Sequence, residues 1–304
     1  MKSHANMAIA TIILAAILGS VGGVFLKFAF KSFSPIATFM LDYLLASAIL
    51  IPIVLITKQY KIEKKDLKIL FWALLFIAGN SLAITIGIKY TTVIVAQILY
   101  FFTPIVVLLL STIQFRQKFH LFEIIGVALG LIGGTIIIAQ SFFSTSAVTQ
   151  LSFGTFQGNL LVLLAVIFWG CYLVASKVFV TKYSPVTITM YACLTNFLIS
   201  VPFVFLEFQN GTFPPRHIFP ESIISIILLG TISCVAVIFL YAWATKYTTS
   251  FIVSSATYIA PISAALVAIP LLGEKVTPLL FIATLIIGVS FYLTSIYPLK
   301  KEGK

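Results

Sequence analysis

Asp42 is the carboxylate that lies deep inside an apolar stretch of the chain, which runs from Pro35 to Thr57. Insertion scales assign a cost of roughly 2.5–3.5 kcal/mol to an aspartate at the centre of a bilayer, so a use for it is expected. One use is a proton-coupling site or a counter-ion for a cationic substrate, because a buried carboxylate takes up a proton or a cation. The alternative is a structural ion pair with Lys27, and the sequence leaves both open.

A duplicated segment supplies the second set of candidates. Lys-Tyr-Thr-Thr occurs at residues 89–92 and again at 246–249, and in each copy eleven residues separate it from a proline, Pro104 or Pro261. One offset of 157 residues relates these features. Lys27 with Ser34-Pro35 likewise matches Lys177 with Ser184-Pro185. The pattern indicates that one half of the chain is a copy of the other.

Each copy places polar and aromatic residues on one helix face before its proline. Positions i, i+3, i+4 and i+7 of a helix share a face. Paired helices with interrupted backbone ladders mark the binding site in inverted-repeat transporters, which favours cavity lining over simple hydrogen bonding between helices. The predicted faces are Gln97, Tyr100, Phe101 and Pro104 in the first copy and Ser254, Thr257, Tyr258 and Pro261 in the second.

Four more residues inside apolar stretches are candidates for the cavity. Asn80 and Asn196 could donate hydrogen bonds to a substrate, or equally could join helices. Trp169 and Tyr172 could stack on a substrate, but we expect them in an aromatic belt at the membrane interface.

The composition is that of a membrane protein. Of 304 residues 61% are hydrophobic and 9% are charged, and the mean hydropathy is +1.14. Soluble domains are about a quarter charged. The net charge of +11 comes mostly from residues between the apolar stretches, so no nucleic-acid partner is expected. Three cysteines inside apolar runs give no metal-ligand spacing, and no phosphate-binding loop is present, so no cofactor, metal or direct ATP drive is expected.

The apolar runs are long enough to cross a bilayer, which takes about 20 residues, and spans of this kind are helical. The predicted class is an all-α polytopic membrane protein with ten transmembrane helices. Residues 1–140 form the first five-helix repeat, residues 141–157 an extracellular or periplasmic linker, and residues 158–304 the second repeat. The spans are Met7–Phe30, Pro35–Thr57, Ile69–Ile88, Thr92–Ile113, Leu121–Gln140, Gly158–Val180, Pro185–Leu206, Ser222–Ala244, Thr249–Ile269 and Thr277–Tyr297.

The basic residues predict the orientation. With both termini in the cytoplasm, fourteen Lys and Arg residues lie on the inner face and five on the other. We therefore expect a multi-pass protein of the inner or plasma membrane with both ends cytoplasmic. Because each half has an odd number of spans, the halves enter the membrane from opposite sides as inverted-topology repeats.

The residues at the helix joints resemble a known family. Lys27 late in the first helix, Ser34-Pro35 opening the second, the Tyr-Thr-Thr start with Pro104 in the fourth, and Gly273-Glu274-Lys275-Val276-Thr277 before the last are similar to EamA-type members of the drug/metabolite transporter superfamily. The resemblance covers nearly the whole chain. It implies a ten-helix bundle around a central cavity that moves amino acids, their derivatives or other small metabolites.

Two positions depart from the family pattern. Arg116-Gln117 stands in the first half where the family has Gly-Glu, in a predicted loop. Asp42, followed by Tyr43, stands where the family often has Arg before an aromatic residue, which changes the charge inside the bundle.

The expected function is that of a secondary transporter or facilitator of small metabolites across the membrane by alternating access, and not an enzyme. The cavity is expected between the first, third, fourth, sixth, eighth and ninth helices. The acidic charge of Asp42 favours cationic or zwitterionic substrates over nucleotide-type or phosphorylated ones. An intramembrane lipid-modifying enzyme is the alternative outside transport. The expected partners are the lipid bilayer, a small-molecule substrate and, through Asp42, protons; a homodimer stays open.

Overall fold

The computed structural model describes residues 2–115, 121–143, 152–248, 250–255, 257 and 259–293. All the regular elements in these ranges are helices. Seven are long and apolar enough to cross a membrane, and three shorter apolar ones span Ile124–Ile137, Ala260–Leu272 and Pro278–Ser290. Within the described residues the ten predicted spans are therefore present, and the predicted fold class is confirmed.

The first half of the chain contains five spans, of which the third begins with a short 3₁₀ turn and the fourth is broken by another. Its elements are α1 (Lys2–Ala29), α2 (Pro35–Ile56), η1 (Lys64–Asp66), α3 (Leu67–Tyr90), α4 (Val93–Leu99), η2 (Tyr100–Phe102), α5 (Thr103–Phe115) and α6 (Leu121–Phe143).

The second half repeats this order. The eighth span of the chain contains a π-helix, η3, which the sequence did not predict, and the ninth span is broken like the fourth. The elements are α8 (Phe156–Val180), α9 (Pro185–Gln209), α10 (Pro220–Leu228), η3 (Leu229–Val237), α11 (Ile238–Tyr247), α12 (Ser250–Ser255), α13 (Ala260–Leu272) and α14 (Pro278–Phe291).

The helix ends follow from local sequence. Ser34 caps α2 by accepting a hydrogen bond from the Ala37 N–H, with Pro35 in the first turn, where its missing N–H is not needed. Thr92 and Thr277 cap α4 and α14 in the same way. Gly273 ends α13 with a φ of 68°, a left-handed conformation that favours glycine.

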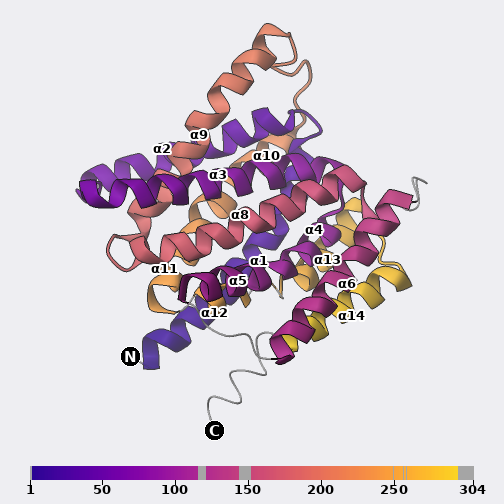
Figure 1. The fold of residues 1–304 in the computed structure, drawn as a ribbon. Coiled ribbons are helices and arrows are strands. Elements are labelled where there is room, and N and C mark those ends of the chain that lie inside the picture. The colour runs from indigo at the N-terminus through magenta and orange to yellow at the C-terminus, as the bar shows by residue number, and fades with distance from the viewer. Residues whose placement is uncertain are drawn as a thin grey trace.

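Helices of one half of the chain pack against helices of the other half (Figure 1). α3 packs along α8, and α1 packs along α10, η3 and α11, which is the same contact with the halves interchanged. α2 packs on α9, and α6 on α14 at one edge of the molecule. We call α3, α4, α5 and α8 the α3 group, and α1, α10, η3, α11 and α13 the α1 group. Each group draws on both halves of the sequence.

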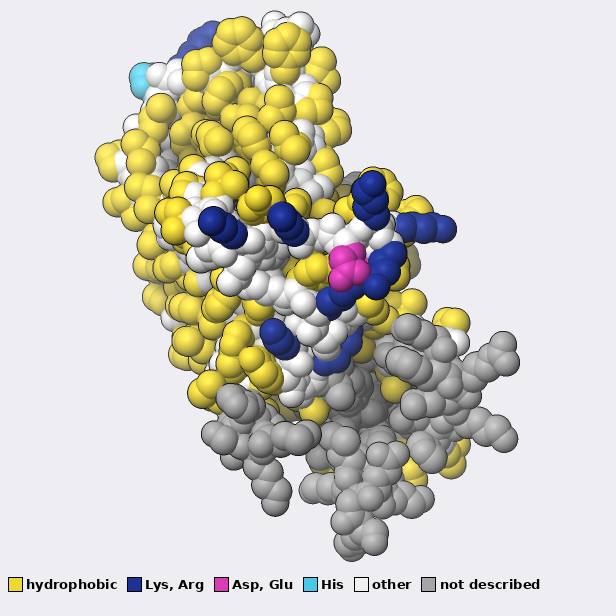
Figure 2. All heavy atoms as spheres, turned by 90° about the vertical axis from the view of Figure 1, so that its left-hand side faces the viewer, with side chains coloured by type: hydrophobic (Ala, Val, Ile, Leu, Met, Phe, Trp, Pro, Cys, Tyr) yellow, Lys and Arg dark blue, Asp and Glu magenta, His cyan; other side chains and the backbone are white. Residues whose placement is uncertain are grey.

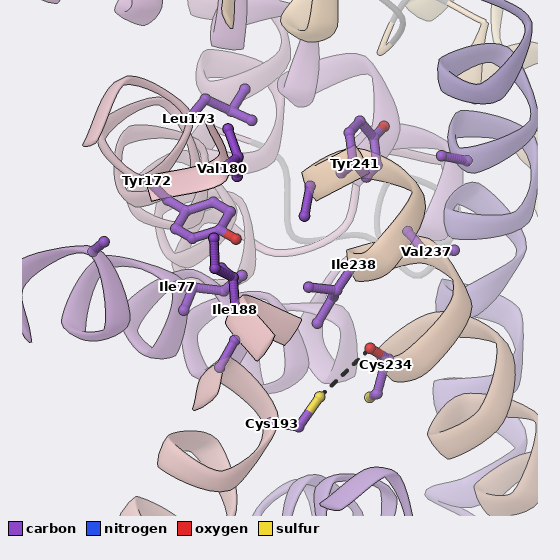
Figure 3. Packing of buried hydrophobic residues seen from close by; sticks show 14 of the residues in the cluster. Ile77, Tyr172, Leu173, Val180, Ile188, Cys193, Cys234, Val237, Ile238 and Tyr241 are labelled. Carbon is purple, nitrogen blue, oxygen red and sulfur yellow. Dashed lines mark hydrogen bonds between the residues drawn. The ribbon is translucent and has the colours of Figure 1, made fainter. Parts of the chain in front are cut away.

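Two buried clusters fill the bundle. The larger one joins α2, α3, α8, α9 and α11, and Figure 3 shows Tyr172, Ile188 and Tyr241 converging from three of these helices. In the same view the Cys193 thiol points to the Cys234 carbonyl oxygen at 3.6 Å, so these cysteines are core residues.

The face shown in Figure 2 is mainly hydrophobic, as contact with lipid requires, and it carries a gathering of Lys and Arg side chains with acidic ones among them. The α8–α9 turn is ion-paired to the α2–α3 connection. Lys182 Nζ lies 3.0 Å from Glu63 Oε1 and 2.5 Å from Asp66 Oδ2. Lys65 and Lys182 lower the pKa of Glu63 through hydrogen bonds.

Candidate functional site

A cavity of about 190 Å³ lies inside the bundle. Its lining comes from the first, second, third, fourth, sixth, eighth and ninth spans. Six of these are the helices expected to surround the cavity, and α2 joins them through Asp42 and Tyr43. Among the described lining residues Asp42 is the charged side chain, and Lys, Arg and His do not occur.

Asp42 lies within α2 and is 3% exposed. Its Oδ1 atom has no hydrogen-bond partner in the described part of the protein. A buried polar atom without a partner costs free energy and requires an explanation. A substrate donor in the cavity would supply that partner.

Lys27 does not pair with Asp42, contrary to the structural alternative considered from the sequence. The salt bridges between described residues do not join the two, and Lys27 interacts electrostatically with Glu274 instead. α1 packs along α13, and the turn after α13 holds Glu274, whereas α2 packs along α9, so Lys27 and Asp42 have different neighbours.

The first predicted face contributes to the cavity in part. Gln97 and Tyr100 line it, and Asn80 from α3 donates hydrogen bonds to Tyr100 Oη at 2.6 Å and to the Ala165 carbonyl oxygen at 2.9 Å. Phe101 is buried in the second hydrophobic cluster and is not a lining residue. The 3₁₀ turn η2 rotates the chain between Tyr100 and Phe102, so neighbouring side chains diverge.

The second predicted face is represented by Thr257, which lines the cavity and donates to the Ser254 carbonyl oxygen at 2.7 Å. Ser254 is fully buried and does not line the cavity, and Tyr258 lies outside the described residues. In both copies the helix is interrupted just before the proline. α5 begins at Thr103, before Pro104, and α13 begins at Ala260, before Pro261.

Trp169 and Tyr172 lie in the middle of α8 and not in an interface belt, so that expectation is wrong. Trp169 is 8% exposed and lines the cavity. Its ring stacks on Tyr172 at 5.4 Å between centroids and meets Tyr241 edge-on at 5.2 Å. Tyr172 supports Trp169 without reaching the cavity, and Figure 3 shows Tyr172 and Tyr241 on opposite sides of the packed cluster.

Asn196, like Phe101, Tyr172 and Ser254, does not line the cavity. It is fully buried in α9 and donates to the Ala192 carbonyl oxygen of its own helix at 3.0 Å.

Sequence reasoning missed Ser233 and Tyr241, and it interpreted the glycines of α1 as packing residues without placing them in the cavity lining. Ser233 lies in the π-helix η3, lines the cavity and has a buried hydroxyl oxygen without a hydrogen-bond partner among the described residues. A Cβ atom at Gly22 would lie 2.8 Å from that oxygen, so glycine here lets α1 approach η3. The signal available was the run Gly19, Gly22 and Gly23 in one apolar helix.

Comparison with known proteins identifies relatives of the whole chain. The model of the EamA-like transporter family matches residues 6–139 and 156–296. A protein of Archaeoglobus fulgidus named "Uncharacterized transporter" is 25% identical over 300 residues, which is 97% of each chain. Another from that organism with the same name is 24% identical over 180 residues, 59% of this chain and 60% of its own length. A solved crystal structure that is 16% identical superimposes over 99% of both chains with a TM-score of 0.69, so the two share a fold.

Proposed function

Because the chain belongs to the EamA-like transporter family, we propose that it is a secondary transporter or facilitator of small cationic or zwitterionic metabolites, including amino acids and their derivatives. The observation that carries the proposal is the acidic cavity. Asp42 is buried in it with one carboxylate oxygen unpartnered, and basic side chains are absent from its described lining.

An ammonium group fits this arrangement better than an anion. Ionised groups that are buried require a partner of opposite charge, and in this cavity the substrate is the available source of positive charge. The indole of Trp169 and the ring of Tyr241 add π-faces, which attract cations.

The alternatives from the sequence are less well supported. A carrier of nucleotide-type or phosphorylated metabolites needs basic groups around the phosphate, and the described lining has none. An intramembrane enzyme does not fit the family, which is one of transporters.

Alternating access is supported by the arrangement of the helices. The α1 group and the α3 group meet around the cavity, and the interruptions before Pro104 and Pro261 lie on opposite groups. Relative motion of the two groups would expose the cavity to one face at a time. We propose as well that both termini lie on the cytoplasmic face, that Asp42 couples transport to protons, and that the protein forms a homodimer.

The test is binding and uptake by the purified protein in liposomes. A panel of organic amines, amino acids, nucleosides and sugar phosphates identifies the class that binds. Asp42→Asn should lower affinity for the cationic ligand about tenfold or more, because charged hydrogen bonds contribute roughly 1.5–3 kcal/mol. Asp42→Glu keeps the charge, and Glu63→Gln removes an exposed carboxylate outside the cavity.

Preference for phosphorylated compounds, or an Asp42→Asn protein that binds and transports amines like the wild type, would refute the cationic substrate. Amine binding that is retained by Glu63→Gln and lost by Asp42→Asn would support it.

A further inference from the structure

Glu274 is a buried carboxylate that the cavity does not use. It lies in the turn between α13 and α14 and is 7% exposed. Its Oε1 accepts a hydrogen bond from the Val93 N–H at 2.6 Å, and its Oε2 accepts one from the Ile94 N–H at 3.0 Å. These are the first two residues of α4, whose N–H groups have no partner within the helix.

The contact joins the two helix groups. α4 belongs to the α3 group, and the turn that holds Glu274 follows α13 of the α1 group. Figure 1 shows α4 and α13 next to one another with α1 alongside. Lys27 of α1 adds an opposite charge that acts on the carboxylate. We call this set, Lys27, Glu274 and the Val93 and Ile94 N–H groups, the Glu274 clasp.

The clasp fixes a wall of the cavity. Gly23 of α1 lines the cavity, and a Cβ atom there would lie 2.8 Å from Val93 Cγ1 and 3.6 Å from Ile88 Cδ1. Val93 therefore packs directly behind Gly23, while Leu26 and Ile88 line the same end of the cavity. The bond from Glu274 to the Val93 N–H holds this packing in place.

The opposite end of the bundle is joined by a different contact. Lys177, the repeat counterpart of Lys27, donates from α8 to the carbonyl oxygens of Thr245 at 2.6 Å and Thr248 at 2.5 Å. In sequence the residue 157 positions before Glu274 is Gln117, which carries no charge and lies outside the described residues. The repeated position therefore holds a carboxylate in the second half of the chain and an uncharged residue in the first.

We propose that Glu274 is a gating residue of transport, which holds α4 against the α13–α14 turn and closes the end of the cavity formed by Gly23, Leu26 and Ile88. Release of the clasp separates the α1 and α3 groups at this end. The proposal rests on the transport function of the family but not on the substrate proposed above.

The Glu274 clasp can release because burying the ionised carboxylate costs desolvation free energy, which offsets part of the stabilisation by its hydrogen bonds. Burial raises the pKa of Glu274 above its ordinary value, and the bonds from Ile94 and Val93 together with Lys27 offset this only in part. The ionised carboxylate in this buried turn lacks the hydration that it would have in water, which disfavours the charged form.

Cys234 provides a readout that needs no substrate. It lines the cavity and is 3% exposed, and Figure 3 shows it inside the bundle. With Cys171→Ser and Cys193→Ala it becomes the remaining thiol of the chain, which has three cysteines. The rate at which N-ethylmaleimide labels it in the purified full-length protein measures how often the cavity opens.

Glu274→Gln keeps the size of the side chain and removes the charge. It should raise the labelling rate of Cys234 about tenfold, the order expected when charge-assisted hydrogen bonds are weakened. Glu274→Asp, which keeps the charge on a shorter side chain, should give an intermediate rate. The matched control is Glu221→Gln, which removes an exposed carboxylate paired with Lys31 at 3.0 Å in the same part of the bundle.

A labelling rate for Glu274→Gln equal to that of the wild type, in protein that elutes as a single folded species, would overturn the proposal. An equal increase for Glu221→Gln would also overturn it, because the effect would then be general loosening. If Glu274→Gln does not fold, Glu274→Asp decides by the same measurement. If the wild-type protein does not transport amines while Glu274→Gln still increases the labelling rate of Cys234, the proposed substrate class is refuted and the gate proposal stands.

Discussion

The role of each polar residue in this bundle depends on whether its side chain has a hydrogen-bond partner. The Asn80 amide donates to Tyr100 and to the Ala165 carbonyl oxygen, whereas Asp42 Oδ1 and Ser233 Oγ, which belong to lining residues, have no hydrogen-bond partner among the described residues. Unsatisfied atoms of lining residues are available to a ligand, whereas those of Thr38, Ser47, Thr103 and Asn196 belong to residues outside the described lining.

Tyr100→Phe tests the role of the hydrogen bond from Asn80. The change removes the hydroxyl that accepts from Asn80 at 2.6 Å and leaves a buried amide donor with one fewer partner. We expect a loss of roughly 1–3 kcal/mol in stability, seen as a lower thermal unfolding temperature in detergent. Tyr60→Phe, which removes the hydroxyl of an exposed tyrosine outside the cavity, is the control. Equal unfolding temperatures for Tyr100→Phe and the wild type would contradict the role.

At the scale of elements, the broken and irregular helices are the ones at the cavity. η2 lies between α4 and α5, and η3 carries Ser233 and Cys234 into the lining. Irregular backbone at membrane depth is tolerated where protein or a cavity surrounds it. A close crossing lies just before α4, where α8 begins against the end of α3.

Gly158→Ala tests that crossing. A Cβ atom at Gly158 would lie 2.7 Å from the Tyr90 carbonyl carbon and 2.9 Å from the Thr91 nitrogen, and backbone atoms cannot move aside as a side-chain tip can. We expect a loss of about 1–3 kcal/mol in stability from overpacking, measured by thermal unfolding. Gly288→Ala is the matched control, since nothing lies within 4 Å of its Cβ position. A Gly158→Ala protein as stable as the Gly288→Ala protein would show that the crossing has slack.

At the scale of the molecule, the two halves share their helices. α3 packs with α8 and α1 packs with α10, η3 and α11, so each half packs extensively against the other. An odd number of spans in each half turns the repeats in opposite directions, and the charge count of fourteen to five predicts which ends are cytoplasmic.

Thiol labelling on intact cells checks this topology. In a background without Cys171, Cys193 and Cys234, a membrane-impermeant reagent should label Asn210→Cys at once and Gln59→Cys only after permeabilisation. The two positions follow α2 and α9, which are repeat counterparts with opposite direction. Labelling of both from the same side would refute the inverted arrangement.

The sequence by itself determined the ten spans, the duplication, the family and the presence of a deep acidic residue. It could do so because a membrane span satisfies its own backbone, and its length and composition are therefore written locally. Only the tertiary structure decided that Asp42, Asn80, Gln97, Tyr100, Trp169 and Thr257 share one cavity, while Phe101, Tyr172, Asn196 and Ser254 do not line it.

The physical reason lies in the solvent. Lipid tails are as apolar as leucine, so hydrophobic pattern does not distinguish the face of a helix that meets lipid from the face that meets protein. That choice is made by packing between distant segments: Gly22 against Ser233, Trp169 against Tyr241, and Glu274 against the first turn of α4. Each of these contacts joins residues far apart in the chain, and no local pattern encodes them.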